Sequence, residues 1–373
     1  LDLDCTDEKY DILTLHGSWA RERQMERRSL MHGKQSVGSV RGESSHQEHP
    51  FIALLSADAT QDAGEVYGMH FVYSGNFLAQ AELSQFDSIR MTMGIHPENF
   101  VWKLEQGESF AAPEVVMTYS SEGLSGMTHH YHDMYRGHLI RGEYRDKKRP
   151  ILINNWEATY FDFNTEKLLK IAEQASKLGI EMLVMDDGWF GHRNDDSTSL
   201  GDWKVNEQKL PGGLKPLVEQ VNALGMKFGI WIEPEMVNPR SELAEKHPDW
   251  IVKAGNREIP RMRNQWLLDL SNPKVQDFVF SVFDNTMKLS PNIDYIKWDA
   301  NRHVENAGSE YLPEDKQSHF WIDYTQGFYK VMERIRAKYP DVLIQACASG
   351  GGRVEYGALK YFDEVWTSDN TVA

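Results

Sequence analysis

The first third of the chain consists of short runs in which apolar and polar residues alternate or apolar residues follow one another. Alternation with a period of two is typical of strands that bury one face of an antiparallel sheet. Turn-forming residues at 74–76, 96–97 and 106–107 separate the runs. We therefore predict an antiparallel β-sandwich over residues 1–125. Its strands are predicted at residues 10–15, 51–55, 66–73, 77–83, 89–95 and 115–119.

The hydrophobic period lengthens to three or four residues between positions 126 and 142. This spacing predicts a helix, which we place at 126–148 as the link between two domains. Three histidines, His129, His130 and His132, fall in the same segment and could be metal ligands. No carboxylate or cysteine stands at the usual ligand spacing around them, so a partly buried linker helix is the favoured interpretation.

From residue 149 onward, apolar strands alternate with amphipathic helices, which indicates a parallel sheet covered by helices. An open doubly wound sheet and an eight-stranded barrel both fit this alternation. All six strands end in polar or aromatic residues, as in a barrel, whereas a doubly wound sheet gathers its ligand residues at one point. We predict a (βα)8 TIM barrel over 149–373, truncated after strand 6. The strands are predicted at 151–156, 182–185, 228–232, 294–299, 342–347 and 364–369, and the helices at 164–178, 214–224, 274–289 and 328–338.

A glycine-rich stretch at residues 349–353 follows the fifth predicted strand. It lacks the spacing of a dinucleotide-binding loop and the lysine of a P-loop, so a phosphate site is the less favoured interpretation. Glycines also let the backbone approach a ligand closely, and we expect that use here.

Lys297 and Asp299 lie two residues apart at the end of the fourth predicted strand, so their side chains share one face of it. Burying such charges costs free energy unless they are paired. An ion pair that closes the strand is one interpretation, and catalytic residues at the mouth of a parallel barrel are the one we favour. A second carboxylate pair, Asp186 and Asp187, ends the second strand, and a helix cap or a turn explains that pair equally well.

Carboxylates and tryptophans together at strand ends are typical of a sugar site, because aromatic rings pack on a pyranose and carboxylates accept hydrogen bonds from its hydroxyls. Cleaving a glycosidic bond requires two carboxyl groups on opposite sides of the anomeric carbon. We expect Lys297 to keep Asp299 ionised, as a nucleophile must be, while Asp369 has no nearby cation on its own strand and keeps a proton more easily. The carboxylates that spacing alone leaves as candidates are Asp186, Asp187, Glu233, Glu235, Asp299 and Asp369.

The formal net charge of −16 argues against a nucleic-acid or anionic-membrane partner and suits a neutral ligand. No apolar run approaches ~18 residues, so no membrane span is predicted. The two cysteines, Cys5 and Cys347, form neither a disulfide framework nor a four-ligand metal site, which favours a reducing compartment and a cytoplasmic location. The chain begins without methionine and stops directly after its last motif, so we expect a fragment of a longer protein.

Four longer motifs stand at the ends of predicted strands: MDDGWFG at 185–191, KWDANR at 297–302, CASGGGR at 347–353 and WTSDNT at 366–371. In this order they resemble the signature segments of the bacterial glycoside hydrolase family 36 α-galactosidases. The resemblance extends into the first domain, at 64–67 and 73–76. It implies a β-sandwich followed by a (βα)8 barrel, with strands seven and eight and a C-terminal β-domain outside this chain.

By motif match, the resemblance implies that Asp299 is the nucleophile and that Asp369 is the general acid and then the base. The implied substrates are melibiose, raffinose and related small α-galactosides, and no metal or cofactor is needed. The implied protein is a homo-oligomer without nucleic-acid or membrane partners. The substrate-binding residues implied by the same match are Trp156, Asp186, Asp187, Trp231, Arg263, Lys297, Asn301, Cys347, Ser349 and Gly350.

Two positions depart from the family pattern. Ala300 stands where the family usually has methionine, and Val372 stands where it has an acidic residue. An α-N-acetylgalactosaminidase or a galactosyl-transferring enzyme on the same scaffold is the nearest alternative function. A non-catalytic sugar-binding protein is a more distant one, since such a protein would lack one of the two carboxylates, Asp299 and Asp369, that are both present here.

Overall fold

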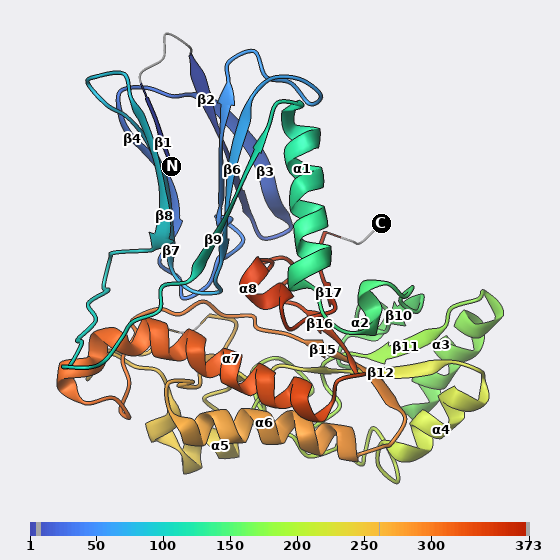
Figure 1. Ribbon diagram of the computed structural model, residues 1–373. Coiled ribbons are helices and arrows are strands. Elements are labelled where there is room, and N and C mark those ends of the chain that lie inside the picture. The colour runs from blue at the N-terminus through green and yellow to red at the C-terminus, as the bar shows by residue number, and fades with distance from the viewer. Residues whose placement is uncertain (5–8, 261, 371–373) are drawn as a thin grey trace. The chain divides into compact units, whose positions relative to one another are not determined.

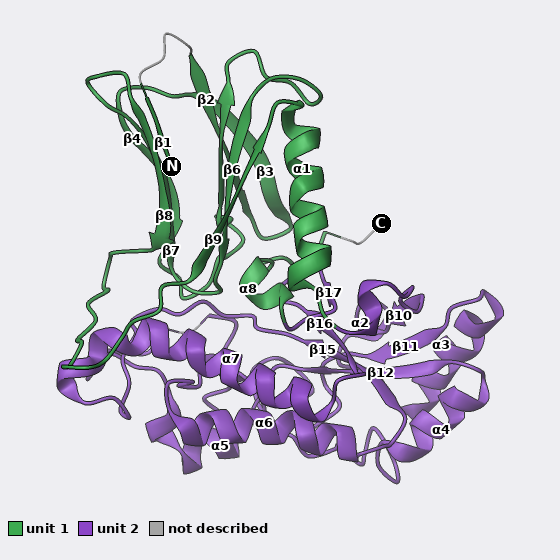
Figure 2. Ribbon diagram, in the orientation of Figure 1, with its two compact units in different colours: residues 1–141, 350–360, 367–371 green, residues 142–349, 361–366, 372–373 purple. Residues whose placement is uncertain are grey.

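The computed structural model describes residues 1–4, 9–260 and 262–370, so that Cys5 and Val372 lie outside the described residues. Internal contacts divide the chain into two compact units (Figure 2). Unit 1 comprises residues 1–141, 350–360 and 367–371, and unit 2 comprises 142–349, 361–366 and 372–373. Two short segments near the end of the chain therefore group with the N-terminal residues. The domain boundaries predicted at 125 and 149 stay predictions.

Unit 1 contains two antiparallel sheets, one of four strands and one of five (Figure 1). All six strands predicted from alternation occur at the expected places, so the prediction of antiparallel strands is confirmed. In spatial order the first sheet consists of β1 (Asp2–Leu3), β8 (Ile89–Ile95), β7 (Phe77–Leu83) and β4 (Gly33–Ser39), and the second of β3 (Arg21–Ser29), β2 (Tyr10–Ser18), β5 (Phe51–Ser56), β6 (Val66–Val72) and β9 (Glu114–Ser120).

Three strands of unit 1, β1, β3 and β4, have no counterpart among the predicted ones. β3 carries six charged side chains in nine residues and is mostly exposed. It lies at one edge of the five-stranded sheet, paired antiparallel to β2, and β4 lies at an edge of the other sheet. An edge strand needs little apolar surface, and charges on it discourage pairing with a second chain. Alternation of apolar residues therefore cannot reveal such strands.

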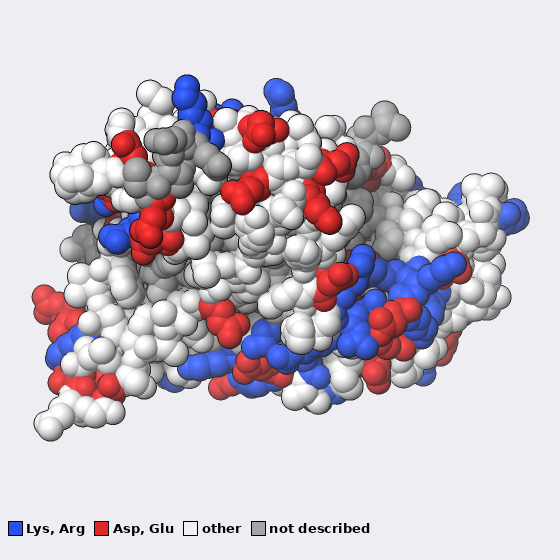
Figure 3. Space-filling model, turned by 45° about the horizontal axis from the view of Figure 1, so that its top comes forward, with Lys and Arg blue, Asp and Glu red and all other residues white. Residues whose placement is uncertain are grey.

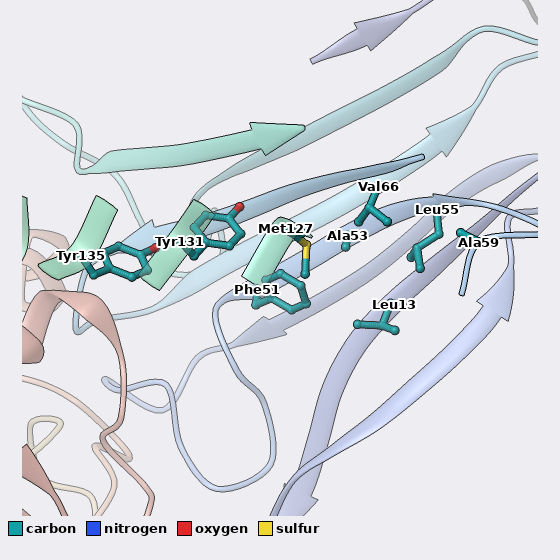
Figure 4. Packing of buried hydrophobic residues seen from close by; sticks show 9 residues of the cluster. All are labelled: Leu13, Phe51, Ala53, Leu55, Ala59, Val66, Met127, Tyr131 and Tyr135. Carbon is teal, nitrogen blue, oxygen red and sulfur yellow. The ribbon is translucent and has the colours of Figure 1, made fainter. Parts of the chain in front are cut away.

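The helix α1 (Gly123–Met134) packs on β6 and β9 and closes the core of the five-stranded sheet (Figure 4). Gly68 on β6 permits this approach, because a Cβ there would lie 2.8 Å from the Met127 sulfur and 2.8 Å from the Tyr131 hydroxyl. The helix continues into the π-helical turn η1 (Tyr135–Leu139). The cluster consists of Leu13, Phe51, Ala53, Leu55, Ala59, Val66, Met127, Tyr131 and Tyr135. A further short helix of unit 1 is α8 (Tyr356–Leu359).

Unit 2 is built on one six-stranded sheet in which every pair of neighbours is parallel, as predicted. Its order is β10 (Leu152–Asn154), β11 (Met182–Met185), β12 (Lys227–Ile232), β15 (Ile293–Trp298), β16 (Leu343–Ala346) and β17 (Glu364–Val365). The helices are α2 (Trp156–Thr159), α3 (Thr165–Lys177), α4 (Lys215–Ala223), α5 (Glu242–Lys246), α6 (Pro273–Lys288) and α7 (Phe320–Lys338). The short elements are η2 (Glu143–Arg145), η3 (Pro248–Trp250), η4 (Glu314–His319) and the antiparallel pair β13 (Met236–Val237) and β14 (Trp266–Leu267).

Local signals in the sequence explain where several of these elements begin. The side chain of Asn164 caps α3 by accepting a hydrogen bond from the Lys167 amide, as predicted. Two predicted strands end early: the first was predicted at 151–156, but β10 ends at Asn154, and the sixth was predicted at 364–369, but β17 ends at Val365. Only two residue pairs join it to β16, so Asp369 lies in a loop rather than in a strand.

Side chains from the two strands that flank β12 meet across Gly229. A Cβ at that glycine would lie 2.8 Å from the Tyr295 ring on β15 and 3.0 Å from Val184 on β11. Val184 and Tyr295 share a buried cluster with Met182 and Leu343. Residues two positions further along β11 and β15 are Asp186 and Lys297, so the same period of two brings charged side chains together above this apolar layer.

Lys and Arg side chains mix with Asp and Glu side chains on the face drawn in Figure 3, despite the net charge of −16. Among the described residues, no helix is both long enough and apolar enough to cross a membrane.

Candidate functional site

Asp299 follows β15 directly and is only 7% exposed. One of its carboxylate oxygens, Oδ2, accepts hydrogen bonds from the Trp231 indole at 3.0 Å and from the Asn301 amide at 2.7 Å. The other, Oδ1, accepts from the backbone N–H of Ala300 at 3.0 Å. Burial opposes ionisation most strongly, but the positive charges of Lys297 and Arg263 and the hydrogen bonds to the carboxylate together outweigh it, and the pKa of Asp299 is held below its usual range. An ionised, immobilised carboxylate is the result.

Lys297 forms its ion pair with Asp186, at 2.8 Å, whereas Asp299 was the expected partner. The two meet because β11 and β15 direct alternate side chains across β12, a relation that spacing within one strand cannot reveal. Asn154 donates a second hydrogen bond to Asp186, at 2.6 Å. Burial works most strongly against the charge of Lys297, yet Asp186, Cys347 and Asp299 together more than offset it and the pKa of Lys297 is raised. Its ammonium also lies 5.5 Å from the ring centre of Trp366.

Asp187 points to a different cation, Arg193, which sequence reasoning missed. The guanidinium binds both carboxylate oxygens of Asp187, at 2.5 and 2.7 Å. It also donates to the Asn238 side chain at 2.9 Å and to the Thr198 carbonyl at 3.0 Å. The Arg193 side chain is 1% exposed, so this is a buried, bidentate ion pair.

Asn301 connects Asp299 to Ser349. The Asn301 side-chain oxygen accepts hydrogen bonds from the backbone N–H and the hydroxyl of Ser349, each at 2.8 Å. Arg263 donates to the Ser349 hydroxyl at 2.8 Å. The buried Cys347 thiol contributes a hydrogen bond that further favours the charged form of Asp299.

Glu233 and Glu235, which spacing left as alternative catalytic carboxylates, both serve as buried acceptors for neighbouring groups. Glu235 accepts a hydrogen bond from the Trp298 indole at 2.7 Å. Glu233 accepts from the Gln265 side chain at 2.9 Å and from the backbone N–H of Asn301 at 2.7 Å. Neither is more than 1% exposed, so both are poorly placed to meet a substrate, and Asp299 is the stronger candidate.

Asp369 belongs to unit 1, where the turn between β2 and β3 and the first residues of β3 hold its segment. The Trp19 indole donates to Asp369 at 2.8 Å, and Glu22 accepts a hydrogen bond from the Ser368 hydroxyl at 2.6 Å. Arg23 donates to the Thr367 carbonyl at 2.7 Å. Trp19, Glu22 and Arg23 lie about 350 positions before their partners in the sequence, and Trp19 and Asp369 are 350 residues apart. No sequence pattern linked these residues to the Asp369 segment.

Gly350 adopts a left-handed conformation with φ of +80°, and a Cβ there would lie 2.5 Å from the Asp369 backbone nitrogen. Close approach to a ligand was expected at this glycine-rich stretch and stays a prediction; the close neighbour of Gly350 is another backbone segment of unit 1. Gly351 adds to this arrangement by donating its N–H to Glu22 at 3.2 Å.

Trp156 is half-buried and packs edge-to-face on Tyr160 and Phe161. Its backbone N–H donates to the side chain of Asn154, the residue that in turn holds Asp186. The predicted residues that unit 2 joins in one set of contacts are Asp186, Trp231, Arg263, Lys297, Asp299, Asn301, Cys347 and Ser349.

Family models match nearly the whole chain. The model described as the glycosyl hydrolase family 36 N-terminal domain matches residues 1–105, and the model described as melibiase matches residues 109–373. The chain belongs to glycosyl hydrolase family 36. The resemblance stated from the four motifs is thus confirmed.

Relatives of this family 36 chain include α-galactosidase AgaA of Geobacillus stearothermophilus, which is 52% identical over 373 residues, and α-galactosidase 1 of Pediococcus pentosaceus, which is 44% identical. Each comparison covers 100% of this chain and 51% of the relative. The crystal structure of AgaA superposes with a TM-score of 0.97, covering 100% of this chain and 52% of that one. One AgaA structure is a complex with raffinose. The chain thus spans about half the length of the relatives it matches.

The residues that sequence reasoning missed in this family 36 chain are mostly partners of the predicted ones. Arg193 comes from a polar loop after β11, and Trp19 comes from the connection between two strands of unit 1. Asn154 was visible as a polar residue at a strand end, the same signal that identified Asp186. That signal would have found it.

Proposed function

We propose that this chain is part or all of a retaining α-galactosidase. The enzyme hydrolyses terminal α-D-galactosyl residues of melibiose, raffinose and related oligosaccharides. The observation that carries the proposal is Asp299, an ionised carboxylate fixed by Trp231, Asn301 and Ala300 at the end of β15. The names of the relatives, α-galactosidases at 52% and 44% identity, support the sugar.

In the proposed mechanism, an Asp299 oxygen attacks the anomeric carbon while the bond to the leaving oxygen breaks and Asp369 gives that oxygen a proton. A galactosyl ester of Asp299 results. Water then attacks the same carbon, Asp369 takes its proton, and the ester bond to Asp299 breaks. Two inversions leave the anomeric configuration unchanged.

For substrate recognition we propose that Asp186 and Asp187 accept hydrogen bonds from the O4 and O6 hydroxyls of galactose. Each oxygen of an ionised carboxylate has two lone pairs, so Asp187 can accept from a sugar hydroxyl while Arg193 holds it. We assign Trp156 and Trp231 to the walls of the pocket.

The same proposal makes Lys297 and Arg263 hydrogen-bond donors to the sugar. It places Asn301 and Ser349 in the substrate-binding set, with Cys347 and Gly350 near O2.

For the architecture we propose that the parallel sheet of unit 2 is part of a (βα)8 barrel and that the antiparallel sheets of unit 1 form a β-sandwich. Contacts between β5 and β7, which belong to different sheets of unit 1, support the sandwich. The meeting of Val184 and Tyr295 across Gly229 supports a curled sheet in unit 2. A cytoplasmic location and a homo-oligomer stay predictions.

The complete protein, meaning this chain with any further segments that its gene encodes, is expected to hydrolyse nitrophenyl α-galactoside with a kcat/KM about 10³-fold or more above that for the α-glucoside. The equatorial O4 of glucose would not supply the sugar hydroxyl that the proposal assigns to the buried carboxylates Asp186 and Asp187. Anomer-resolved NMR of the first product should show the α form. Equal efficiency on the two glycosides, or a preference for the N-acetylgalactosaminide, would contradict the proposal.

Replacing Gly350 with alanine is expected to lower kcat about a hundredfold, because the new Cβ would displace the backbone at Asp369, and small displacements of a catalytic group are costly. Gly107→Ala is the matched control. Gly107 also has a positive φ, of +88°, but open space around it, so this variant carries only the backbone strain. Equal kcat in the two variants would show that the contact with Asp369 is unimportant.

A further inference from the structure

Glu233 is the residue that follows β12, and its side chain is fully buried, with 0% exposure. Of the described residues, the two that donate hydrogen bonds to it are uncharged groups: the backbone N–H of Asn301 to Oε1 at 2.7 Å and the side-chain amide of Gln265 to Oε2 at 2.9 Å. A second carboxylate, Asp299, belongs to the same group of contacts through Asn301. Two buried acids thus share one connecting residue.

We propose that Glu233 is a positioning residue that acts as a neutral carboxylic acid, holding Asn301 so that Asn301 and Ser349 fix the nucleophile Asp299. This inference rests on the proposed function, because it assigns Asp299 its catalytic role.

The positioning role of Glu233 follows from the hydrogen bonds that hold Asn301. Its backbone N–H bonds to Glu233, its side-chain N–H bonds to Asp299 at 2.7 Å, and its side-chain oxygen accepts from Ser349. Asn301 is 8% exposed, so water offers little replacement for a lost partner. Removing the Glu233 acceptor therefore loosens Asn301 and, through it, Asp299.

The neutral state of Glu233 follows from the charged groups around it. The charged groups that act on Glu233 are Asp299 after β15, Arg263 before β14 and Arg193 after β11. Arg193 is already engaged by Asp187 and Arg263 by Ser349. Burial, and next the negative charge of Asp299, raise the pKa of Glu233 to about 8.

Gln265 can accommodate the proton. Its side-chain oxygen is buried and has no hydrogen-bond partner among the described residues, and turning the amide over places that oxygen where it accepts from a Glu233 O–H. A neutral Glu233 leaves Asp299 as the ionised member of the two. Above about pH 8, Glu233 loses its proton, and two like charges then share one buried network.

The test compares Glu233→Gln and Glu233→Ala in the complete protein, with nitrophenyl α-galactoside as substrate and thermal unfolding as the check on folding. Glutamine has the shape of the neutral acid, so kcat at pH 6.5 is expected within about threefold of wild type. Alanine removes the acceptor, so its kcat is expected to fall about a hundredfold with little change in KM. Glu235→Gln, at the same strand end, is the matched control.

Two further measurements distinguish a Glu233 that acts as a neutral acid from a Glu233 that only supports the structure. The ratio of Glu233→Gln activity to wild-type activity should rise as pH passes about 8, while the ratio for Glu235→Gln stays level. The infrared spectrum at pH 7 should lose one protonated-carboxyl carbonyl band in Glu233→Gln. A fall of Glu233→Gln to the level of Glu233→Ala, a pH-independent ratio, or an unchanged infrared band would overturn the inference. An inactive wild type would instead refute the proposed function, and the infrared band would still report the protonation of Glu233.

Discussion

Replacing Asp299 with alanine is expected to lower the kcat of the complete protein by about 10⁴-fold or more, the scale of losing a covalent nucleophile. The side chain is ionised and held by donors that include Trp231, Asn301 and Ala300, so its loss removes the attacking oxygen from a fixed position. Glu233 cannot substitute, because it is fully buried and bonded elsewhere. Steady-state hydrolysis of nitrophenyl α-galactoside measures the loss.

A small anion should restore part of that loss. Azide can enter the space left by the Asp299 carboxylate and attack the anomeric carbon directly, which yields a galactosyl azide of inverted configuration. Asp299→Asn is the matched control, because it keeps the volume and leaves azide no room. Near-wild-type activity in Asp299→Ala would remove Asp299 as the nucleophile, and so would azide rescue of an equal size in both variants.

Much of the fold was predictable because apolar periodicity reports burial. Strands such as β7 and β11 occur at the predicted residues, and α3 begins after its predicted cap Asn164. The predictions of strands failed where buried residues do not recur with a regular period. β3 is a charged edge strand, and β17 is held by two residue pairs only, so neighbouring chain segments decide where each begins and ends.

The residues of the candidate site also divide into those that the sequence predicted and those that it could not predict. Residues at the carboxyl ends of parallel strands could be grouped from sequence, because those ends share one edge of the sheet. Their partners could not: Lys297 pairs with Asp186 across β12, and Arg193 reaches Asp187 from a loop. Pairing depends on how far the sheet curls and how a loop folds back, and neither leaves a mark in residue spacing.

Replacing Arg193 with methionine is expected to lower the free energy of unfolding by about 3–5 kcal/mol, because the change leaves the buried carboxylate of Asp187 without its cation. Methionine fills much of the same volume, so the loss reflects charge rather than a cavity. Urea unfolding followed by tryptophan fluorescence measures it. The matched control is Arg334→Met, which breaks a surface pair with Asp277 of similar length, 2.8 Å, and is expected to cost less than about 1 kcal/mol.

A double variant separates stability from recognition. In Arg193→Met with Asp187→Leu, both charges are gone, so most of the lost stability should return, since apolar residues often replace a buried ion pair without cost. Activity on the galactoside should stay low, because the proposed acceptor for a galactose hydroxyl is missing. If the double variant regains both stability and activity, Asp187 is a structural partner of Arg193 only. If the single variant unfolds no more easily than Arg334→Met, the buried pair contributes little to the free energy of unfolding.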